Sequence, residues 1–356
     1  MDLVSTKIIQ EKLILINTNK LGHLLKLKKI SYFAKSLQHE IINRKVYKMF
    51  SGLMFFFILF EGYVFAQNET MFSQTFFNPG FINPAYAGND SSNYFNVMAL
   101  NRTLFSGLEN APNTTVLNVN GPLNIGDVPG GINVSFCRDQ AGYFTNPSFN
   151  IGYAYQHKLT KGSLGFGLSA GIYFSTLDSE SWVLPDGSSD PALPTEKSKQ
   201  SFDLGLGVYY SNNQLYAGLS VTHLIPPVFA QGDNAIKLSQ SYYLMGGYKF
   251  KLNNPDMELR PSVLIQSDLS SFLYSLNAMF FYQNKYWIGL DYRINTSVGI
   301  IAGLNLLPEL RLGYSYGYNT SVLSKFSGGN HEVMLTYRFS VYIEKGKQKY
   351  KSIRYL

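Results

Sequence analysis

Apolar and polar residues alternate with a period of two in many short segments after residue 93. In residues 164–174, one face carries Leu, Phe, Leu, Ala, Ile and Phe, and the other carries Gly, Gly, Ser, Gly and Tyr. Residues 202–210, 310–318 and 333–341 show the same alternation. Successive side chains of a β-strand point to opposite faces, so this period predicts strands that each have one apolar or aromatic face.

Clusters of Gly, Pro, Asn or Ser separate these segments and delimit about fourteen predicted strands. Their predicted bounds are 93–104, 114–120, 131–137, 147–157, 163–174, 201–211, 214–222, 241–251, 259–267, 272–282, 286–293, 297–305, 309–318 and 330–342. A bacterial membrane barrel has an even number of antiparallel strands. We therefore predict an all-β fold, a transmembrane antiparallel β-barrel of about 14 strands over residues 93–342.

The apolar faces need a partner, which is a core in a soluble β-sandwich and lipid in a membrane barrel. The opposite faces carry Gly, Ser, Asn and a few charges, as a hydrated lumen allows. Aromatic residues gather near strand ends at 209–210, 242–243 and 280–282, where membrane barrels have aromatic girdles. Charged residues make up only 15% of the chain, against about 25% in a typical soluble protein. These features favour lipid as the partner of the apolar faces.

One clear apolar run, Phe50–Phe60, lies near the N-terminus. It is short for a membrane-spanning helix, follows three basic residues, and has the length of a signal-peptide hydrophobic region. We predict a signal peptide over residues 45–66, cleaved between Ala66 and Gln67. Residues 1–44 have no place in such a signal, so they are either the product of a start codon assigned too far upstream or a functional cytoplasmic extension.

The formal charge of +7 belongs to the two ends of the chain. Residues 1–66 hold ten Lys/Arg and four acids, which leaves 20 Lys/Arg and 19 acids in residues 67–356. The tail 343–356 is basic and shows no strand pattern. The charge therefore does not indicate a nucleic-acid partner. The single cysteine, Cys137, excludes an internal disulfide framework and is expected to be an inert thiol on the lumen side.

Residues 67–92 are predicted to be a periplasmic segment that leads into the barrel. Two Asn-Pro pairs, at 78–79 and 83–84, disfavour helix because the residue before Pro is pushed out of the α region. The NPAYAG motif here is either a partner-binding or plug element, or a rigid turn in which Gly88 tolerates a positive φ. The motif residues are Asn83, Pro84, Ala85, Tyr86, Ala87 and Gly88. The long connections 178–200 and 226–237 are candidate extracellular loops.

Five charged residues on the predicted strands are expected to face the lumen, because a charge on the lipid face costs several kcal/mol at the bilayer midplane. They are Asp203, Asp291, Arg293, Arg311 and Arg338. We expect internal ion pairs that hold a plug or narrow a channel. The glycine pairs 165/167 and 205/207 are expected to be small lumen-facing residues, since no strand-to-helix turn surrounds them.

No catalytic, cofactor-binding or metal-binding residues are predicted. The histidines of the mature chain, at 157, 223 and 331, lie on separate segments without metal-ligand spacing. His331 beside Glu332 is the one candidate for a hydrolase couple, and it lacks a local nucleophile signature.

Short motifs along the chain resemble those of the PorP/SprF family. FNPGFINPAYAGN at 77–89 is similar to the family's NPAYAG signature. The similarity continues in order with APNT at 111–114, GPL at 121–123, DQAG at 139–142, YAY at 153–155, PDG at 185–187, YAGLS at 216–220, HL at 223–224, RPS at 260–262, WIGLDYR at 287–293, GYSY at 313–316, HEVML at 331–335 and YRF at 337–339. One departure is Arg102-Thr103-Leu104-Phe105, where the family usually has Trp in the aromatic position.

The resemblance implies a non-enzymatic outer-membrane component of type IX secretion that helps to secrete or anchor a large surface protein, such as a gliding adhesin. It implies outer-membrane lipid, secretion machinery on the periplasmic side and the exported surface protein as partners, and no cofactor. Two alternatives stay open at this point. One is an outer-membrane channel for a small solute, and the other is an outer-membrane hydrolase that depends on His331.

Overall fold

The computed structural model describes residues 71–89, 94–177, 198–227, 238–320, 324 and 327–340. The predicted signal peptide and its cleavage site, residues 1–44, most of both long loops and the basic tail lie outside the described residues. No helix in the described part of the chain is long and apolar enough to cross a membrane.

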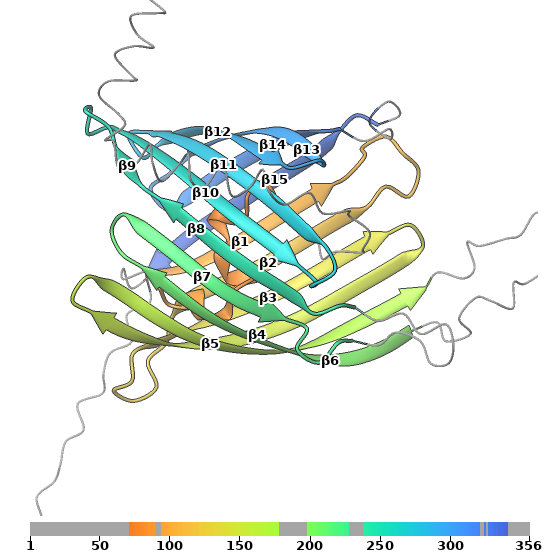
Figure 1. Cartoon of the computed structure of the whole chain (residues 1–356), viewed down its shortest axis with the longest axis horizontal. Helices are drawn as coiled ribbons and strands as arrows, with labels where there is room; N and C mark the ends of the chain where they lie inside the picture. The colour runs from red at the N-terminus through yellow and green to blue at the C-terminus, as the bar shows by residue number, and fades with distance from the viewer. Residues whose placement is uncertain are drawn as a thin grey trace, which may run out of the picture. The chain divides into compact units, whose positions relative to one another are not determined.

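The described strands form one antiparallel sheet that closes on itself, since the last strand pairs with the first (Figure 1). The strands are β1 (Tyr94–Thr103), β2 (Asn113–Pro122), β3 (Gly130–Ala141), β4 (Phe144–Leu159), β5 (Gly162–Leu177), β6 (Ser198–Ser211), β7 (Leu215–Thr222), β8 (Ser241–Tyr248), β9 (Phe250–Lys251), β10 (Met257–Ser267), β11 (Phe272–Tyr282), β12 (Tyr286–Arg293), β13 (Ser297–Asn305), β14 (Leu310–Asn319) and β15 (Asn330–Ser340).

β8 and β9 are two parts of one interrupted strand. Both pair with β10 in the same register, Gly247 opposite Ser262 and Phe250 opposite Leu259. Pro261 lies between the two paired stretches and has no N–H to donate to the ladder. The described ring therefore has fourteen strand positions, and the predicted antiparallel barrel is confirmed.

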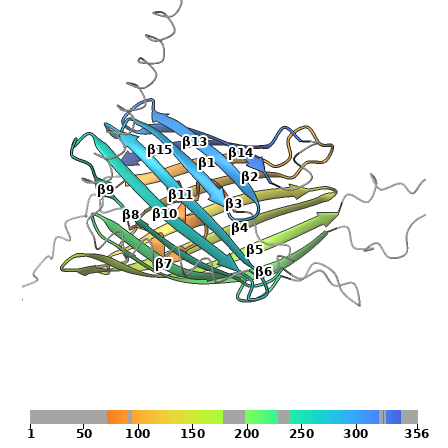
Figure 2. The same ribbon diagram turned by 45° about the horizontal axis from the view of Figure 1, so that its top comes forward.

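The two rims of the barrel differ. β1 begins and β15 ends at one rim, which we call the short-turn edge, because its connections, such as 160–161 and 212–214, are brief. The opposite rim, the long-loop edge, carries the connections 104–112, 178–197, 223–240 and 320–329. Figure 2 shows β4, β5 and β6 extending farther than the neighbouring β7 and β8.

The wall follows the predicted alternation. Along β12 and β14, outward Leu290 and Tyr318 are 59% and 55% exposed, whereas inward Asp291 is buried at 1%. At the strand ends where aromatic girdles are predicted, only some of the aromatic side chains point outward. Tyr282 faces outward, but Phe281 beside it is buried inside the barrel, as are Tyr209 and Tyr243. The lumen therefore contains large aromatic side chains as well as small polar ones.

Candidate functional site: an N-terminal plug in the lumen

Residues 71–89, which we call the plug, lie inside the ring of strands (Figure 1). The plug consists of three short 3-10 helices, η1 (Thr75–Phe77), η2 (Pro79–Phe81) and η3 (Pro84–Tyr86). Each of the last two begins with the Pro of an Asn-Pro pair, because Pro has a φ suited to the first helical position and lacks the N–H that would be unsatisfied there. Residues 71–89 of the segment predicted to lead into the barrel thus occupy part of the barrel's interior.

The NPAYAG motif is anchored by its asparagine. The Asn83 side-chain oxygen accepts from the Ala85 N–H at 2.9 Å and caps η3. Its Nδ2 donates to the carbonyl oxygens of Val208 and Leu219, at 3.1 and 3.2 Å, on β6 and β7. Asn83 is fully buried, so one side chain both shapes the turn and ties it to two wall strands.

Wall side chains donate hydrogen bonds to four backbone carbonyls of the plug. Gln156 of β4 donates its Nε2 to the carbonyls of Ala85 and Ala87, at 3.0 and 2.7 Å. Ser220 of β7 donates to the Ile82 carbonyl at 2.7 Å, and Asn133 of β3 donates to the Gly80 carbonyl at 3.1 Å. Buried backbone groups need such partners, because an orphaned one costs about 1–3 kcal/mol. The small polar residues of the lumen face are therefore binding groups for the plug.

Inward glycines bring the wall into backbone contact with the plug. A Cβ on Gly167 of β5 would overlap backbone atoms of Pro84 and Ala85. Gly88 adopts a φ of +67°, as expected from its place in the motif, and lies against Gly131 so closely that neither position has room for a side chain. The wall glycines in such backbone contact include Gly131, Gly165 and Gly167, whereas a Cβ on Gly207 or Gly313 would meet the side chain of Asn83 or Gln74.

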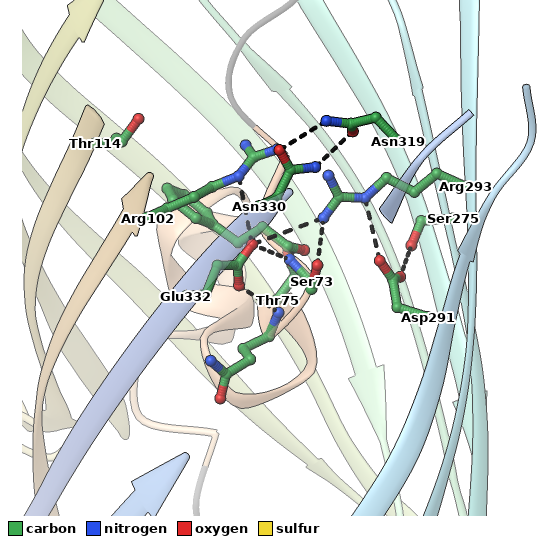
Figure 3. A network of polar contacts seen from close by, with 12 residues as sticks. Ser73, Thr75, Arg102, Thr114, Ser275, Asp291, Arg293, Asn319, Asn330 and Glu332 are labelled. Atoms are coloured by element: carbon green, nitrogen blue, oxygen red, sulfur yellow. Dashed lines mark hydrogen bonds and ion pairs between the residues drawn. The ribbon is translucent and has the colours of Figure 1, made fainter. Parts of the chain in front are cut away.

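A buried carboxylate, Glu332 of β15, holds the other end of the plug (Figure 3). Its two oxygens accept the backbone N–H groups of Ser73 and Gln74 at 2.7 and 3.2 Å. Arg102 of β1 lies 3.5 Å from the Glu332 Oε1, and Arg293 of β12 lies 3.8 Å from the same atom. One carboxylate thus joins the plug to two wall cations.

Arg293 extends this network around the wall. Its Nη2 donates to the Ser73 hydroxyl of the plug at 2.8 Å, and its Nε lies 3.4 Å from Asp291 Oδ2. The Ser275 hydroxyl donates to the same carboxylate at 2.9 Å. The side chains of Arg102, Arg293, Asp291 and Glu332 are all at most 7% exposed. Burial of two cations and two anions together fits a paired set, because an unpaired charge here would be strongly destabilising.

Two clusters of apolar side chains also hold the plug against the wall. Phe72 of the plug packs in a cluster with wall residues that include Met98, Met279, Trp287 and Met334. Met71, Ile82 and Ala85 pack in a second cluster, whose wall members are Tyr209, Tyr243, Met245 and Leu264. Inward Met and Trp side chains have no reason to face an empty aqueous lumen, and here they contact the plug.

A comparison with protein families identifies the chain. Residues 64–337 match the family described as "Type IX secretion system membrane protein PorP/SprF". The chain belongs to this family. The match includes the whole plug and nearly all of the barrel of this PorP/SprF protein, and a search of curated proteins finds no match.

Several solved outer-membrane proteins share a distant similarity with this PorP/SprF protein. Omp33 of Acinetobacter baumannii is 8% identical, with a TM-score of 0.43, and the match covers 70% of this chain and 98% of Omp33. The translocator domain of the autotransporter NalP from Neisseria meningitidis is 13% identical, with a TM-score of 0.42 and coverage of 76% and 96%. The CymD monoaromatic hydrocarbon channel is 12% identical, with a TM-score of 0.44 and coverage of 78% and 95%.

The charged residues expected in the lumen play different parts in this PorP/SprF protein. Asp291 and Arg293 form the pair beside the plug described above. Arg311 lies over the rings of plug Phe77 and wall Trp287, at 5.3 and 5.6 Å. The Asp203 Oδ2 lies 3.2 Å from the His223 Nδ1. Arg338 donates to the Pro308 carbonyl at the short-turn edge, and no contact between it and the plug is among those described.

The candidate hydrolase couple, His331 and Glu332, is split by the wall. Glu332 points inward to the plug, whereas His331 points outward, where its Nδ1 lies 2.6 Å from the Tyr314 hydroxyl. Neighbouring residues of a strand face opposite sides, so the two side chains cannot act on one substrate. No cluster of His, Cys, Asp or Glu that could hold a metal occurs among the described residues.

Sequence reasoning missed Glu332, Arg102 and Ser73 as parts of the site. Arg102 drew notice only as a departure from the family pattern, and Glu332 only as a partner for His331. A signal was present, however. Both are ionisable residues on the polar face of a predicted membrane strand, and such residues are costly unless paired.

We expect Asn83→Ala to lower the free energy of unfolding by about 1–3 kcal/mol, because it removes the side-chain hydrogen bonds to the Val208 and Leu219 carbonyls and the cap of η3. Urea unfolding of the protein in lipid vesicles, followed by tryptophan fluorescence, measures the change. Asn213→Ala, at an exposed position in the 212–214 turn, is the control and should stay within about 0.5 kcal/mol of wild type. Equal effects of both substitutions would contradict a special role for Asn83.

Proposed function

We propose that this membrane component of type IX secretion acts by binding, without catalysis, and helps to secrete or anchor a large surface protein such as a gliding adhesin. The observation that supports this proposal is the way in which the barrel wall holds the plug. Inward side chains of the wall, among them Gln156, Ser220, Asn133 and Glu332, are engaged in holding residues 71–89. A lumen devoted to holding part of its own chain favours a scaffold over a conduit.

The two rims of the barrel would each bind a different partner. In bacterial outer-membrane barrels, short turns face the periplasm and longer loops face outward. On this basis we assign the short-turn edge to the periplasm, where secretion machinery would bind, and the long-loop edge to the cell surface, where an exported protein would be displayed. The exposed Leu, Ile, Phe and Tyr residues of the outer wall would contact outer-membrane lipid.

Deletion of the gene should remove one or a few surface proteins and leave the uptake of small antibiotics unchanged, because a plugged scaffold adds no general permeability. Mass spectrometry of peptides shaved from intact cells by protease measures the first effect, and drug sensitivity measures the second. Reintroduction of the wild-type gene is the control and should restore the missing proteins. Unaltered levels of every surface protein in the deletion strain would overturn the proposal.

A further inference from the structure

A cavity of about 670 Å³ opens at the short-turn edge, on the side of the plug that faces this rim. We call it the vestibule. Plug residues Phe76, Phe77 and Tyr86 form part of its lining, together with Tyr209 and Tyr216 of the wall. Most lining residues of the strands lie on inward positions, and the outward ones, Leu159, Leu215 and Tyr248, lie at strand ends next to the rim, so the vestibule faces the barrel axis. Its volume falls within the range of about 300–1,000 Å³ seen for binding pockets.

The charged residues that line the vestibule are all cations. They are Lys158, Lys249, Arg260 and Arg311. Glu258, which does not line the cavity, lies 3.1 Å from Lys249 and also pairs with Arg260, so it offsets only part of this charge. A concave site that is lined by cations concentrates anionic ligands.

Outside the vestibule, the described residues of the short-turn edge hold equal numbers of cations and acids. The cations are Lys161, Lys251, Lys285 and Arg338, and the acids are Asp127, Asp256, Glu258 and Glu309. The tail 341–356, which follows β15 at this edge, adds five Lys/Arg and one Glu. Like charges disfavour the tail as an occupant of the vestibule. An occupant of opposite charge must come from another molecule.

Besides the cations, aromatic rings line the vestibule. Tyr209 and Tyr216 stack with their centroids 5.9 Å apart, and Phe76 lies 6.3 Å from Tyr216. Arg311 covers the ring of Phe77 at 5.3 Å, which places a cation beside an apolar surface. Such surfaces bind aromatic side chains, and adjacent guanidinium groups bind carboxylates. A simple inorganic anion would use only the cations.

We propose that the vestibule binds a short, extended polypeptide segment rich in Asp or Glu and containing at least one aromatic residue, contributed by a partner protein on the short-turn side. This inference rests on the proposed function, since it supplies the chemistry by which a secretion partner would engage the barrel. The plug is then part of the binding surface, because Phe76, Phe77 and Tyr86 contribute directly to the cavity.

The test uses the full-length protein in lipid nanodiscs and a short fluorescent peptide in which Asp alternates with Phe. We expect saturable binding by fluorescence anisotropy, weakened by salt, and no binding of a peptide in which Lys replaces every Asp. The double variant Lys158→Gln with Arg311→Gln should weaken binding roughly tenfold or more. The single variant Lys158→Glu, at an exposed position, should weaken it severalfold without disturbing the fold.

The matched control removes the same charge from the same edge outside the cavity. Lys161→Gln with Lys285→Gln should change the affinity less than about twofold. Equal weakening by both double variants, no change with Lys158→Glu, or displacement of the peptide by inorganic phosphate at matched charge concentration would each overturn the proposal. The first two would show that no binding occurs in the vestibule, and the third that it is an anion site only.

A cellular arm separates this inference from the proposed function. The Lys158→Glu variant, expressed in the deletion strain, should fail to restore full surface display, whereas the Lys161→Gln and Lys285→Gln variant should restore it. Full restoration by Lys158→Glu would overturn the vestibule's role and leave the proposed function standing. A deletion strain with normal surface display would overturn the function itself.

Discussion

Replacing Glu332 by Leu should lower the free energy of unfolding by about 3–5 kcal/mol. The substitution leaves Arg102 and Arg293 buried without their shared carboxylate, and it removes the acceptor for the Ser73 and Gln74 N–H groups. Two cations left close together would also repel each other. We expect the plug to leave its seat more readily than the wall unfolds, because the wall keeps its ladder hydrogen bonds.

Urea unfolding in lipid vesicles measures the total change, and limited proteolysis near residue 71 measures release of the plug. Glu309→Leu is the matched control, since Glu309 is an exposed carboxylate in the 306–309 turn. Glu332→Gln should fall between wild type and Glu332→Leu, because an amide oxygen still accepts one hydrogen bond. A Glu332→Leu protein as stable as the Glu309→Leu protein would show that the network does not hold the plug.

Gly167→Val should open the barrel. The added side chain would occupy the space of Pro84 and Ala85 backbone atoms, which cannot move aside as a flexible side chain can. Overpacking of this kind costs about 1–3 kcal/mol if the plug stays, and displacement of the plug relieves it. Single-channel recordings in planar bilayers should then show stepwise conductance that the wild-type protein lacks.

Gly246→Ala is the control for this experiment. Gly246 also lies on a wall strand, but a Cβ there would come no closer than 3.6 Å to a described atom, the Tyr216 carbonyl oxygen. This variant should remain closed. Wild-type conductance equal to that of Gly167→Val would instead support the small-solute channel that the sequence left open.

The strands could be predicted from sequence because each one carries its own evidence. The predicted bounds 272–282, 286–293 and 297–305 agree with β11, β12 and β13 to the residue. A period of two is a local property, and turns of Gly, Asn and Ser mark where it stops. The interrupted strand formed by β8 and β9 falls within one predicted strand, residues 241–251.

The plug could not be predicted because its evidence lies elsewhere in the chain. Ser73 contacts Glu332 across 259 positions, and nothing near either residue indicates the other. Alternation places Phe281 and Tyr282 on opposite faces but does not say which face meets lipid. An inward Met or Trp on a polar face, such as Met334 or Trp287, is the feature that would have indicated a filled lumen.

The shared carboxylate also constrains the order of assembly. Residues 71–89 precede every strand in the chain, yet Glu332 lies on the last strand and Arg102 on the first. Their ion pair forms only after β1 has paired with β15. Because the two residues are far apart in the sequence, bringing them together carries a large cost in loop-closure entropy. We therefore expect the N-terminal end of the plug to bind this carboxylate only after the ring of strands has closed, so that its protection from protease during refolding would report the closure.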